Sequence, residues 1–186
     1  MLDPLVATAI SIGFGIMFLL GAVHKLTALA EFRAILADYR LLPAKAVDSS
    51  ALAVIGAEAC LGLGWLFAPE TRVVASATAI LLLVYAAAIA VNLRRGRTHI
   101  SCGCGFGQFA GGVDLLSGWL VARNLLLVAV AALGSLPAAE RTFGALDYVT
   151  LAAALATSML LFVCANQLIQ NRAAIASWRR GAARDE

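Results

Sequence analysis

Long apolar runs with few or no charged side chains constrain the fold of this chain more than any other feature. Residues 5–23 form such a run, and a helix of about 19 residues is roughly 28 Å long. The hydrocarbon core of a bilayer is about 30 Å thick, so this run can span it. Further runs occupy residues 50–67, 73–91, about 114–136 and 148–169. The pattern predicts an all-α, polytopic membrane helix bundle with about five transmembrane helices.

Composition favours a membrane protein without a separate soluble module. Of the 186 residues, 62% are hydrophobic and 13% are charged, whereas soluble domains are about 45–50% apolar and about 25% charged. The mean hydropathy is +0.90. We therefore expect one integral membrane domain over residues 1–186, with a basic tail at about 170–186. The lipid bilayer is its expected surrounding, and no basic and aromatic pattern indicates a nucleic-acid partner.

One segment in the first half is too charged to cross a membrane. Residues 26–42 carry apolar side chains at spacings of three and four, with charged residues between them. This pattern predicts an amphipathic helix at the membrane interface, ending before Pro43. The apolar run before it starts after Asp3 and Pro4, which suit a helix cap and a first-turn proline. No basic residue precedes that run, so we expect a retained helix and not a secretory signal.

Two of the four cysteines lie one residue apart in a glycine-rich connection, Ser101-Cys102-Gly103-Cys104-Gly105-Phe106-Gly107. A disulfide between Cys102 and Cys104 would close a small, strained ring, and strained, accessible disulfides tend to be catalytic or regulatory. The glycines would let a partner approach closely. We therefore predict a thiol–disulfide site. Because the usual redox motif is Cys-x-x-Cys, a metal or thiol-relay site and an unreactive glycine-rich loop are the alternatives.

The surroundings of this motif bear on its chemistry. His99 precedes Cys102 by three residues, and a nearby imidazolium would stabilise a thiolate. Backbone that is not helical lies at membrane depth only where protein buries it or where it lines a wet cavity. The apolar, glycine-rich stretch at residues 100–113 can therefore fold back into the bundle.

One acidic residue, Glu58, lies near the middle of the run at residues 50–67. An ionisable side chain at bilayer depth is expected to face the bundle and to have a partner. Arg123, His24 and Lys25 are the candidate partners, and a Glu58–Arg123 pair is the one we single out. Two interpretations remain open, a structural ion pair and a proton-handling group beside a redox site.

Two polar residues lie inside the fourth apolar run. Arg123 and Asn124 come one to two turns after its expected start, for which Asp114 is a plausible N-cap. Arg123 could extend to the interface, pair with Glu58 or stabilise a thiolate. Asp147 is the expected cap of the fifth helix.

The remaining polar candidates have plainer interpretations. Cys60 lies four residues from both Gly56 and Gly64, a spacing typical of closely packed membrane helices, which favours a small packing residue over a redox centre. Cys164 is either a resolving thiol or a buried, unreactive one. His24 is either an interfacial polar residue or a proton carrier.

The distribution of basic residues predicts an orientation. With five spans, the first connection, the cysteine-containing connection and the C-terminal tail share one side and carry most of the lysines and arginines. The opposite side has only Arg72 and Arg141. The positive-inside rule then places the N-terminus outside and the cysteines towards the cytoplasm. Disulfide chemistry is expected in the oxidising compartment, so a re-entrant connection or electron transfer across the membrane would reconcile the two.

A set of polar and aromatic residues follows a recognisable order. It comprises His24-Lys25, Phe32, Tyr39-Arg40-Leu41-Leu42-Pro43, Glu58, Asn92-Leu93, Gly96, Cys102-Gly103-Cys104, Trp119 and Arg123-Asn124. This order resembles the methylamine-utilisation MauE family, which groups with DoxX-like small membrane proteins. The resemblance runs from Leu5 to about Leu136, and its most specific part is Cys-Gly-Cys followed by Phe-Gly and an Arg-Asn helix. Gly105 stands where relatives are expected to have Phe.

The resemblance implies a maturation factor for methylamine dehydrogenase in the bacterial inner membrane. Its implied partners are a MauD-like thioredoxin-fold protein and the disulfide-rich small subunit of the dehydrogenase, which carries the tryptophan tryptophylquinone cofactor. Cys102 and Cys104 would exchange disulfides, with Arg123, Glu58, His99 and Asn124 in supporting roles. We assign no metal site and no certain cofactor, and a quinone is a candidate electron acceptor.

Three hypotheses follow. The first is thiol–disulfide exchange, which would make the chain an oxidoreductase, although the sequence does not decide whether it is an enzyme. The second is a non-enzymatic membrane scaffold or chaperone with structural cysteines. The third is a carrier of small solutes or metal ions that uses Cys102, Cys104 and His99.

Overall fold

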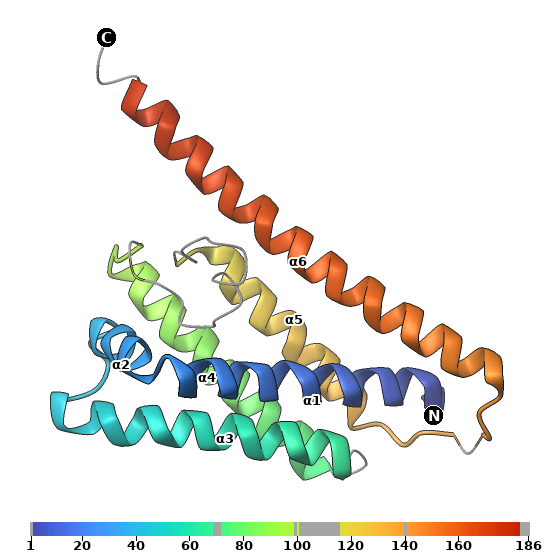
Figure 1. The fold of residues 1–186 in the computed structure, drawn as a ribbon. Coiled ribbons are helices and arrows are strands. Elements are labelled where there is room, and N and C mark those ends of the chain that lie inside the picture. Colours follow the sequence, from blue (N-terminus) through green and yellow to red (C-terminus); the bar gives the residue numbers. More distant parts are fainter. Residues whose placement is uncertain (1, 69–71, 99, 101–115, 140, 183–186) are drawn as a thin grey trace.

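The computed structural model describes residues 2–68, 72–98, 100, 116–139 and 141–182 of the 186-residue chain. This part consists of helices and connections, with one isolated bridge between Leu2 and Ala138. The helices are α1 (Pro4–Thr27), α2 (Leu29–Asp38), the 3₁₀ turn η1 (Ala44–Ala46), α3 (Val47–Phe67), α4 (Arg72–Arg94), α5 (Gly118–Gly134) and α6 (Ala145–Ala182). The predicted all-α fold is confirmed (Figure 1).

Among the described residues, four helices are long and apolar enough to cross a membrane. They are α1, α3 together with η1, α4, and the first part of α6, Ala145–Ala165. Helix α5 is also apolar but has only 17 residues, about 25 Å of helix, which is near the lower limit for a span. The chain is a multi-pass membrane protein, and the expected five spans correspond to four long helices and one shorter helix.

Helix α1 begins where the sequence predicts. Asp3 is its N-cap, and the carboxylate of Asp3 accepts a hydrogen bond from the Leu5 N–H at 2.8 Å. Pro4 occupies the first helical position, where its missing N–H is no loss. The residue before the cap is also fixed, because the Leu2 N–H donates to the carbonyl of Pro137 at 2.9 Å.

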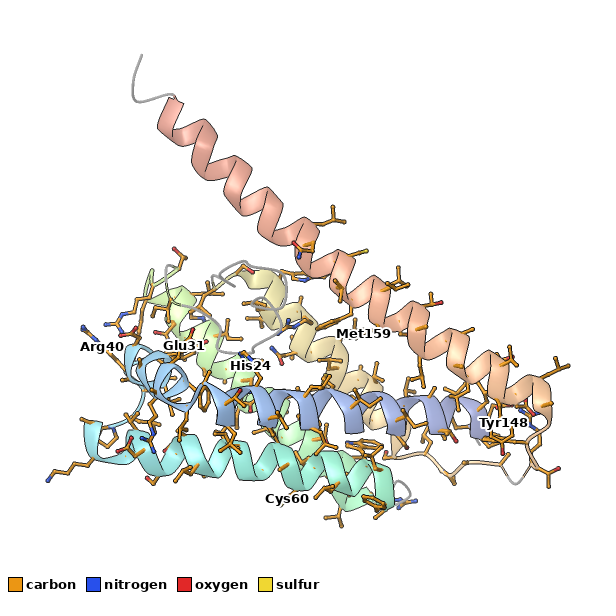
Figure 2. The ribbon with its side chains drawn as sticks, viewed as in Figure 1. His24, Glu31, Arg40, Cys60, Tyr148 and Met159 are labelled. Atoms are coloured by element: carbon orange, nitrogen blue, oxygen red, sulfur yellow. The ribbon has the colours of Figure 1, made fainter. Side chains whose placement is uncertain are left out.

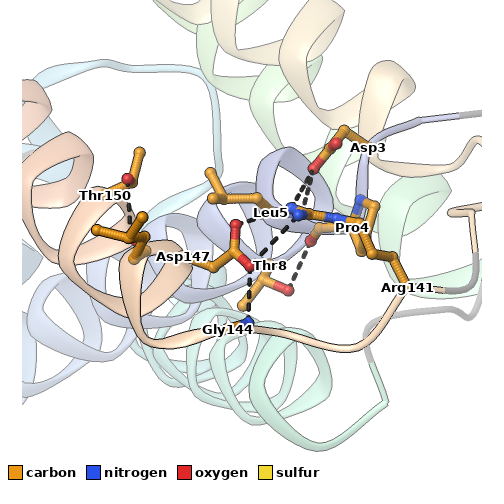
Figure 3. A network of polar contacts seen from close by, with 9 residues as sticks. Asp3, Pro4, Leu5, Thr8, Arg141, Gly144, Asp147 and Thr150 are labelled. Carbon is orange, nitrogen blue, oxygen red and sulfur yellow. Dashed lines mark hydrogen bonds and ion pairs between the residues drawn. The ribbon is translucent and has the colours of Figure 1, made fainter.

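A polar network joins the start of α1 to the start of α6 (Figure 3). The Arg141 guanidinium lies 2.9 Å from Asp147 Oδ1 and 3.6 Å from Asp3 Oδ1. Asp147 Oδ2 also accepts the N–H of Gly144 at 2.8 Å. Asp147 was expected to precede the helix as its cap. It lies instead within the first turn and caps the helix from there, because α6 already begins at Ala145.

Helices α1 and α3 run antiparallel and cross closely at two glycines (Figure 1). A Cβ atom on Gly62 would lie 2.7 Å from Leu19 Cγ and 3.1 Å from the carbonyl oxygen of Gly15. Beside this crossing the rings of Phe14 and Trp65 stack with centroids 5.1 Å apart. Small residues therefore bring the two backbones together, as is usual where helices pack in lipid.

The other helices complete the bundle around this pair. Helix α4 packs mainly on α5, and the buried Trp65 Nε1 of α3 donates to Thr78 Oγ1 of α4 at 2.8 Å. Helix α6 contacts α1 and diverges from the bundle towards its C-terminal end (Figure 1). The end of α1, α2, the end of α4 and the start of α5 lie at the same end of the molecule (Figure 1).

The predicted amphipathic helix exists but is shorter than residues 26–42. Helix α1 continues through Thr27, and α2 spans Leu29–Asp38. Arg40 adopts a positive φ of 48°, which ends the helical geometry before Pro43 is reached. Phe32 and Tyr39 are buried, so the apolar face of α2 covers the bundle as expected.

Two predicted boundaries are wrong. Helix α5 begins at Gly118 with Ser117 at the N-cap position, later than expected; the predicted cap, Asp114, lies outside the described residues. Helix α6 was expected to end near Ile169 and instead continues to Ala182. The polar, alanine-rich sequence after Ile169 has good helix formers, and a helix need not stop where the apolar run stops.

Two predicted burials are also wrong. Cys60 is exposed and lies on the side of α3 that faces away from α1 (Figure 2). A Cβ atom on Gly56 would meet nothing within 4 Å, so the packed face of α3 contains Gly62 and not Gly56. Cys164, for which a buried position was one interpretation, is exposed on α6.

Candidate functional site

The predicted cysteine site, Cys102 and Cys104, lies outside the described residues together with His99. Both ends of this connection are described. The Leu116 N–H donates to the carbonyl oxygen of Ile100 at 3.1 Å. Ile100 and Leu116 are buried in one cluster with Tyr39, Ile89 and Leu120. The two described ends of this connection therefore meet at one packed point, formed by residues of α2, α4 and α5 and the positions next to them.

A buried polar residue accompanies this cluster on α4. Asn92 is 0% exposed, and its Nδ2 donates to the carbonyl of Ala88 at 3.1 Å. Within the described part of the chain, no donor bonds to Asn92 Oδ1. Buried acceptors are normally satisfied, so this atom is suited to a donor from the adjoining connection.

The best-defined polar group is a buried ion pair between α1 and α3. Lys25 Nζ lies 2.8 Å from Glu58 Oε1 and 2.7 Å from Glu58 Oε2, and the two side chains are only 6% and 5% exposed. The Tyr85 hydroxyl on α4 donates to Glu58 Oε1 at 2.7 Å. Lys25 Nζ also lies 5.7 Å from the centroid of the Phe32 ring. Residues of α1, α3, α4 and α2 thus meet around the Lys25–Glu58 pair.

The geometry of the helix pair explains why these charges can approach. A Cβ atom on Gly21 would lie 3.4 Å from Glu58 Oε2 and 3.5 Å from Lys25 Nζ, so a larger side chain would crowd the pair. Lys25 lies in the last turn of α1, where the helix dipole favours a cation. Each group in the network therefore has a charged or hydrogen-bonding neighbour, as burial of an ionised pair requires.

Glu58 faces the bundle and has a partner, as the sequence predicts, but its ion pair is with Lys25. The singled-out partner, Arg123, has its guanidinium carbon 5.7 Å from the Phe162 ring centroid on α6. Lys25 reaches Glu58 because α1 packs antiparallel on α3. Spacing in the sequence does not reveal this packing, so it could not show which of the three basic residues pairs with Glu58.

A cavity of about 380 Å³ opens beside this network. Glu58, Arg123 and Asn124 line it together with Lys25 and Tyr85, and most of its remaining wall is aliphatic or aromatic. Asn124 Nδ2 donates to the carbonyl of Leu120 at 2.8 Å. The structure therefore brings the three described residues of the predicted site to one cavity.

The cavity also adjoins the packed ends of the cysteine connection. Tyr39 and Ile89 belong both to that cluster and to the cavity wall. Burial raises the pKa of Tyr39 to about 12, so its hydroxyl is protonated at neutral pH. The cavity thus reaches from the network at Glu58 to the place where the connection starts and ends.

Sequence reasoning left Lys25 and Tyr85 out of the predicted site, although a signal for both exists. Lys25 continues the buried stripe of Phe14, Phe18 and Ala22 on α1. Tyr85 follows the buried Leu82 of α4 by three residues. A polar residue that lies three or four positions from buried apolar residues of the same helix shares their face. This spacing therefore identifies the polar side chains that point into the bundle.

The metal-carrier hypothesis gains no further ligands from this region. Within the described ranges, no group of three histidine, cysteine or acidic side chains could hold a metal ion. Its proposed ligands, Cys102, Cys104 and His99, belong to the part that is not described.

Comparison with known proteins identifies the family. Residues 3–137 match the family "Methylamine utilisation protein MauE". The chain belongs to the MauE family. The methylamine utilization protein MauE of Paracoccus denitrificans is 38% identical over 174 residues, covering 90% of this chain and 89% of that protein. The MauE of Paracoccus versutus is 37% identical over 169 residues, covering 89% and 88%.

A third MauE relative, from Methylophilus methylotrophus, is 38% identical over 103 residues and covers 55% of this chain. No solved structure matches. The family match at residues 3–137 contains α1 to α5, the cysteine connection and the buried network, whereas α6 lies outside it.

Proposed function

We propose that this protein is an inner-membrane maturation factor for methylamine dehydrogenase in bacteria. It supports disulfide formation in the small subunit of that enzyme by thiol–disulfide exchange, together with a MauD-like thioredoxin-fold partner. The observation that carries the proposal is the family match, since relatives that align over about nine-tenths of the chain are named for methylamine utilisation. The match also includes the Cys-Gly-Cys connection.

The chemistry assigned to Cys102 and Cys104 is a two-step exchange. A thiolate of the reduced substrate or partner attacks one sulfur of the Cys102–Cys104 disulfide and forms a mixed disulfide, releasing the other cysteine as a thiolate. A second thiolate of the attacking protein then displaces the first cysteine. The attacking protein leaves with a disulfide, and both cysteines of the pair are reduced.

The anchoring of the connection supports this role. Cys102 follows the buried Ile100 by two residues, and two residues of chain span at most about 7 Å. Chain length alone therefore keeps Cys102 within reach of the packed cluster of Ile100, Leu116 and Tyr39. Such tethering limits the positions that the thiols can take and so lowers the entropy lost on meeting a partner.

The supporting residues have distinct roles in this proposal. Arg123 and His99 favour the thiolate form of a neighbouring cysteine, because a positive charge lowers a thiol pKa. Glu58 holds Lys25 in the buried network and is a proton acceptor at the cavity. Asn124, bonded to the Leu120 carbonyl at 2.8 Å, fixes the wall next to Arg123.

Replacing Cys102 or Cys104 with serine tests the proposal. Each variant should abolish assembly of active methylamine dehydrogenase while the protein remains in the membrane, since one thiol cannot complete the exchange. With one cysteine of the pair removed, the thiolate of the other should attack the disulfide of the oxidised thioredoxin-fold partner, release one partner thiolate and accumulate as a mixed disulfide, which a non-reducing gel would show.

The chain supplies matched controls for this experiment. Cys60→Ser and Cys164→Ser remove exposed thiols elsewhere, and both variants should support normal assembly. If the Cys102→Ser/Cys104→Ser protein still supports full assembly of the dehydrogenase, thiol exchange is excluded and a scaffold takes its place.

A further inference from the structure

We propose that the cavity beside Lys25, Glu58 and Tyr85 binds the ring of a lipid-soluble quinone. This inference rests on the proposed function, because the quinone would accept the electrons that disulfide formation releases. The site itself is built from described residues of the bundle and does not depend on the placement of the cysteines.

The wall of the cavity sets the first requirement for a ligand. Its volume of about 380 Å³ lies within the range of about 300–1,000 Å³ usual for small-molecule sites. Most of the wall is apolar, with Phe18, Leu82 and Ile89 among its residues. A ligand must therefore be largely apolar, and a molecule dissolved in the bilayer meets this requirement.

The polar groups set the second requirement. Lys25 Nζ has three N–H donors, of which the two oxygens of Glu58 use two. Arg123 lines the same cavity and adds a second cationic donor group. Donors in an apolar pocket select a neutral ligand with carbonyl acceptors, since an anion would have to leave water for an apolar wall. A quinone ring carries two carbonyl oxygens on an apolar plane.

The third requirement comes from the chemistry of the proposed function. Oxidation of two thiols to one disulfide releases two electrons and two protons. A quinone takes up two electrons and two protons and becomes a quinol, so the exchange balances without another reactant. The buried contacts of Lys25 and Tyr85 with Glu58, each between 2.7 and 2.8 Å, provide acidic and basic groups that can move those protons.

The cavity has a route for such a molecule along the bundle. Its lining includes Leu42, in the connection between α2 and α3, and Ser50 in the first turns of α3, as well as Met17 of α1 and Leu82 of α4. Phe162 of α6 also lies on its wall. A flat ring with an isoprenoid tail can therefore reach the network at Glu58 while its tail remains among apolar side chains.

Binding of decylubiquinone to the purified full-length protein in detergent tests the inference. We expect saturable binding to the wild-type protein, measured by equilibrium dialysis. Lys25→Met/Glu58→Met should weaken binding about tenfold or more, the effect of losing a charged hydrogen-bonding group. The double variant removes both charges together. Proteins generally tolerate the replacement of a whole buried ion pair, so this variant should still fold. Leu52→Met, on an exposed part of α3, is the control and should bind normally.

Two outcomes would overturn the inference. One is the absence of saturable binding to the wild-type protein, or equal binding by the wild-type protein and the Lys25→Met/Glu58→Met variant. The other is displacement of decylubiquinone by decanol at equal concentration, which would assign the cavity to an alkyl chain instead of a quinone ring.

A final measurement separates this inference from the proposed function. The Cys102→Ser/Cys104→Ser protein should bind decylubiquinone as the wild type does but form no quinol. Reduced wild-type protein should convert one decylubiquinone to quinol for each disulfide formed. Binding without quinol formation by the wild-type protein would contradict the role as electron acceptor, whereas normal dehydrogenase assembly by the Cys102→Ser/Cys104→Ser protein would contradict only thiol exchange.

Discussion

The two halves of the α1–α3 pair are built in opposite ways. In one half Gly15 and Gly62 let the backbones touch, and Phe14 stacks on Trp65 with 5.1 Å between the ring centroids. In the other half the same two helices are joined by Lys25 and Glu58, and a cavity of about 380 Å³ lies beside them. One helix pair therefore contains both a closed, apolar contact and an open, charged one.

The difference indicates which half is specialised for function. The closed half needs only small residues and van der Waals contact, the usual basis of helix association in lipid. A buried ion pair is weak support for stability, because desolvation offsets much of the attraction between the charges. Charges and a cavity that add little stability at the open half therefore indicate that this half binds a ligand or transfers protons.

The largest expected effect comes from breaking the ion pair on one side. Lys25→Met or Glu58→Met alone leaves an uncompensated buried charge and should lower the free energy of unfolding by about 3–5 kcal/mol. The double variant should lose much less, because no charge remains. Titration of the purified protein with a denaturing detergent measures the free energy of unfolding. If the double variant instead lost the sum of the two single losses, the contact between Lys25 and Glu58 at 2.7 Å would contribute no coupling energy.

The next largest effect concerns the closed half. Gly62→Val would add a Cβ atom about 2.7 Å from Leu19 Cγ, which is too close for van der Waals contact. We expect a loss of about 1–3 kcal/mol from overpacking. Gly56→Ala is the matched control on the same helix, since a Cβ there meets nothing within 4 Å. It should leave stability unchanged or raise it by about 0.5–1 kcal/mol. A similar response at both glycines would contradict the close crossing.

A smaller effect is expected from the third member of the network. Tyr85→Phe removes the hydroxyl that donates to Glu58 Oε1 at 2.7 Å, while Lys25 still holds the carboxylate. The loss should be about 1.5 kcal/mol, the lower end of the range for hydrogen bonds to charged groups. In the Lys25→Met/Glu58→Met background the same substitution should have little effect, because the acceptor is gone. A loss of equal size in both backgrounds would mean that Tyr85 acts through packing alone.

The sequence predicted the helices well because each apolar run is long and carries few charges, and bilayer thickness leaves few other solutions. It also placed Glu58 correctly, since a carboxylate at membrane depth must face protein. It could not choose Lys25 over Arg123 or His24, because that choice depends on how α1 lies against α3. The error at Cys60 has a related cause. Four-residue spacing identified a stripe of small residues on α3, but contacts with α1 decide that Gly62 and not Gly56 is packed.

The cysteine site illustrates a different limit. Glycine-rich spacing around Cys102 and Cys104 predicts thiol chemistry, but nothing in that spacing indicates where the connection joins the bundle. The structure supplies this point, since Ile100 and Leu116 are hydrogen-bonded to each other and packed against Tyr39. Contacts between α2, α4 and α5 involve residues far apart in the sequence, and no local pattern records them.

The smallest expected effect comes from an ion pair outside the bundle, and it separates the influence of burial from that of charge. Arg33 Nε lies 3.2 Å from Asp48 Oδ1, but the two side chains are 39% and 74% exposed. Water screens such pairs, so Arg33→Gln should lower the free energy of unfolding by about 0.2–1 kcal/mol at most. The loss should shrink further as salt is added, since the screening length falls to about 3 Å at 1 M. The loss in the Lys25→Met protein should change little with salt, because its charges are shielded from the solvent. If both variants respond alike to salt, the contrast between the open half of the bundle and its surface would have to be abandoned.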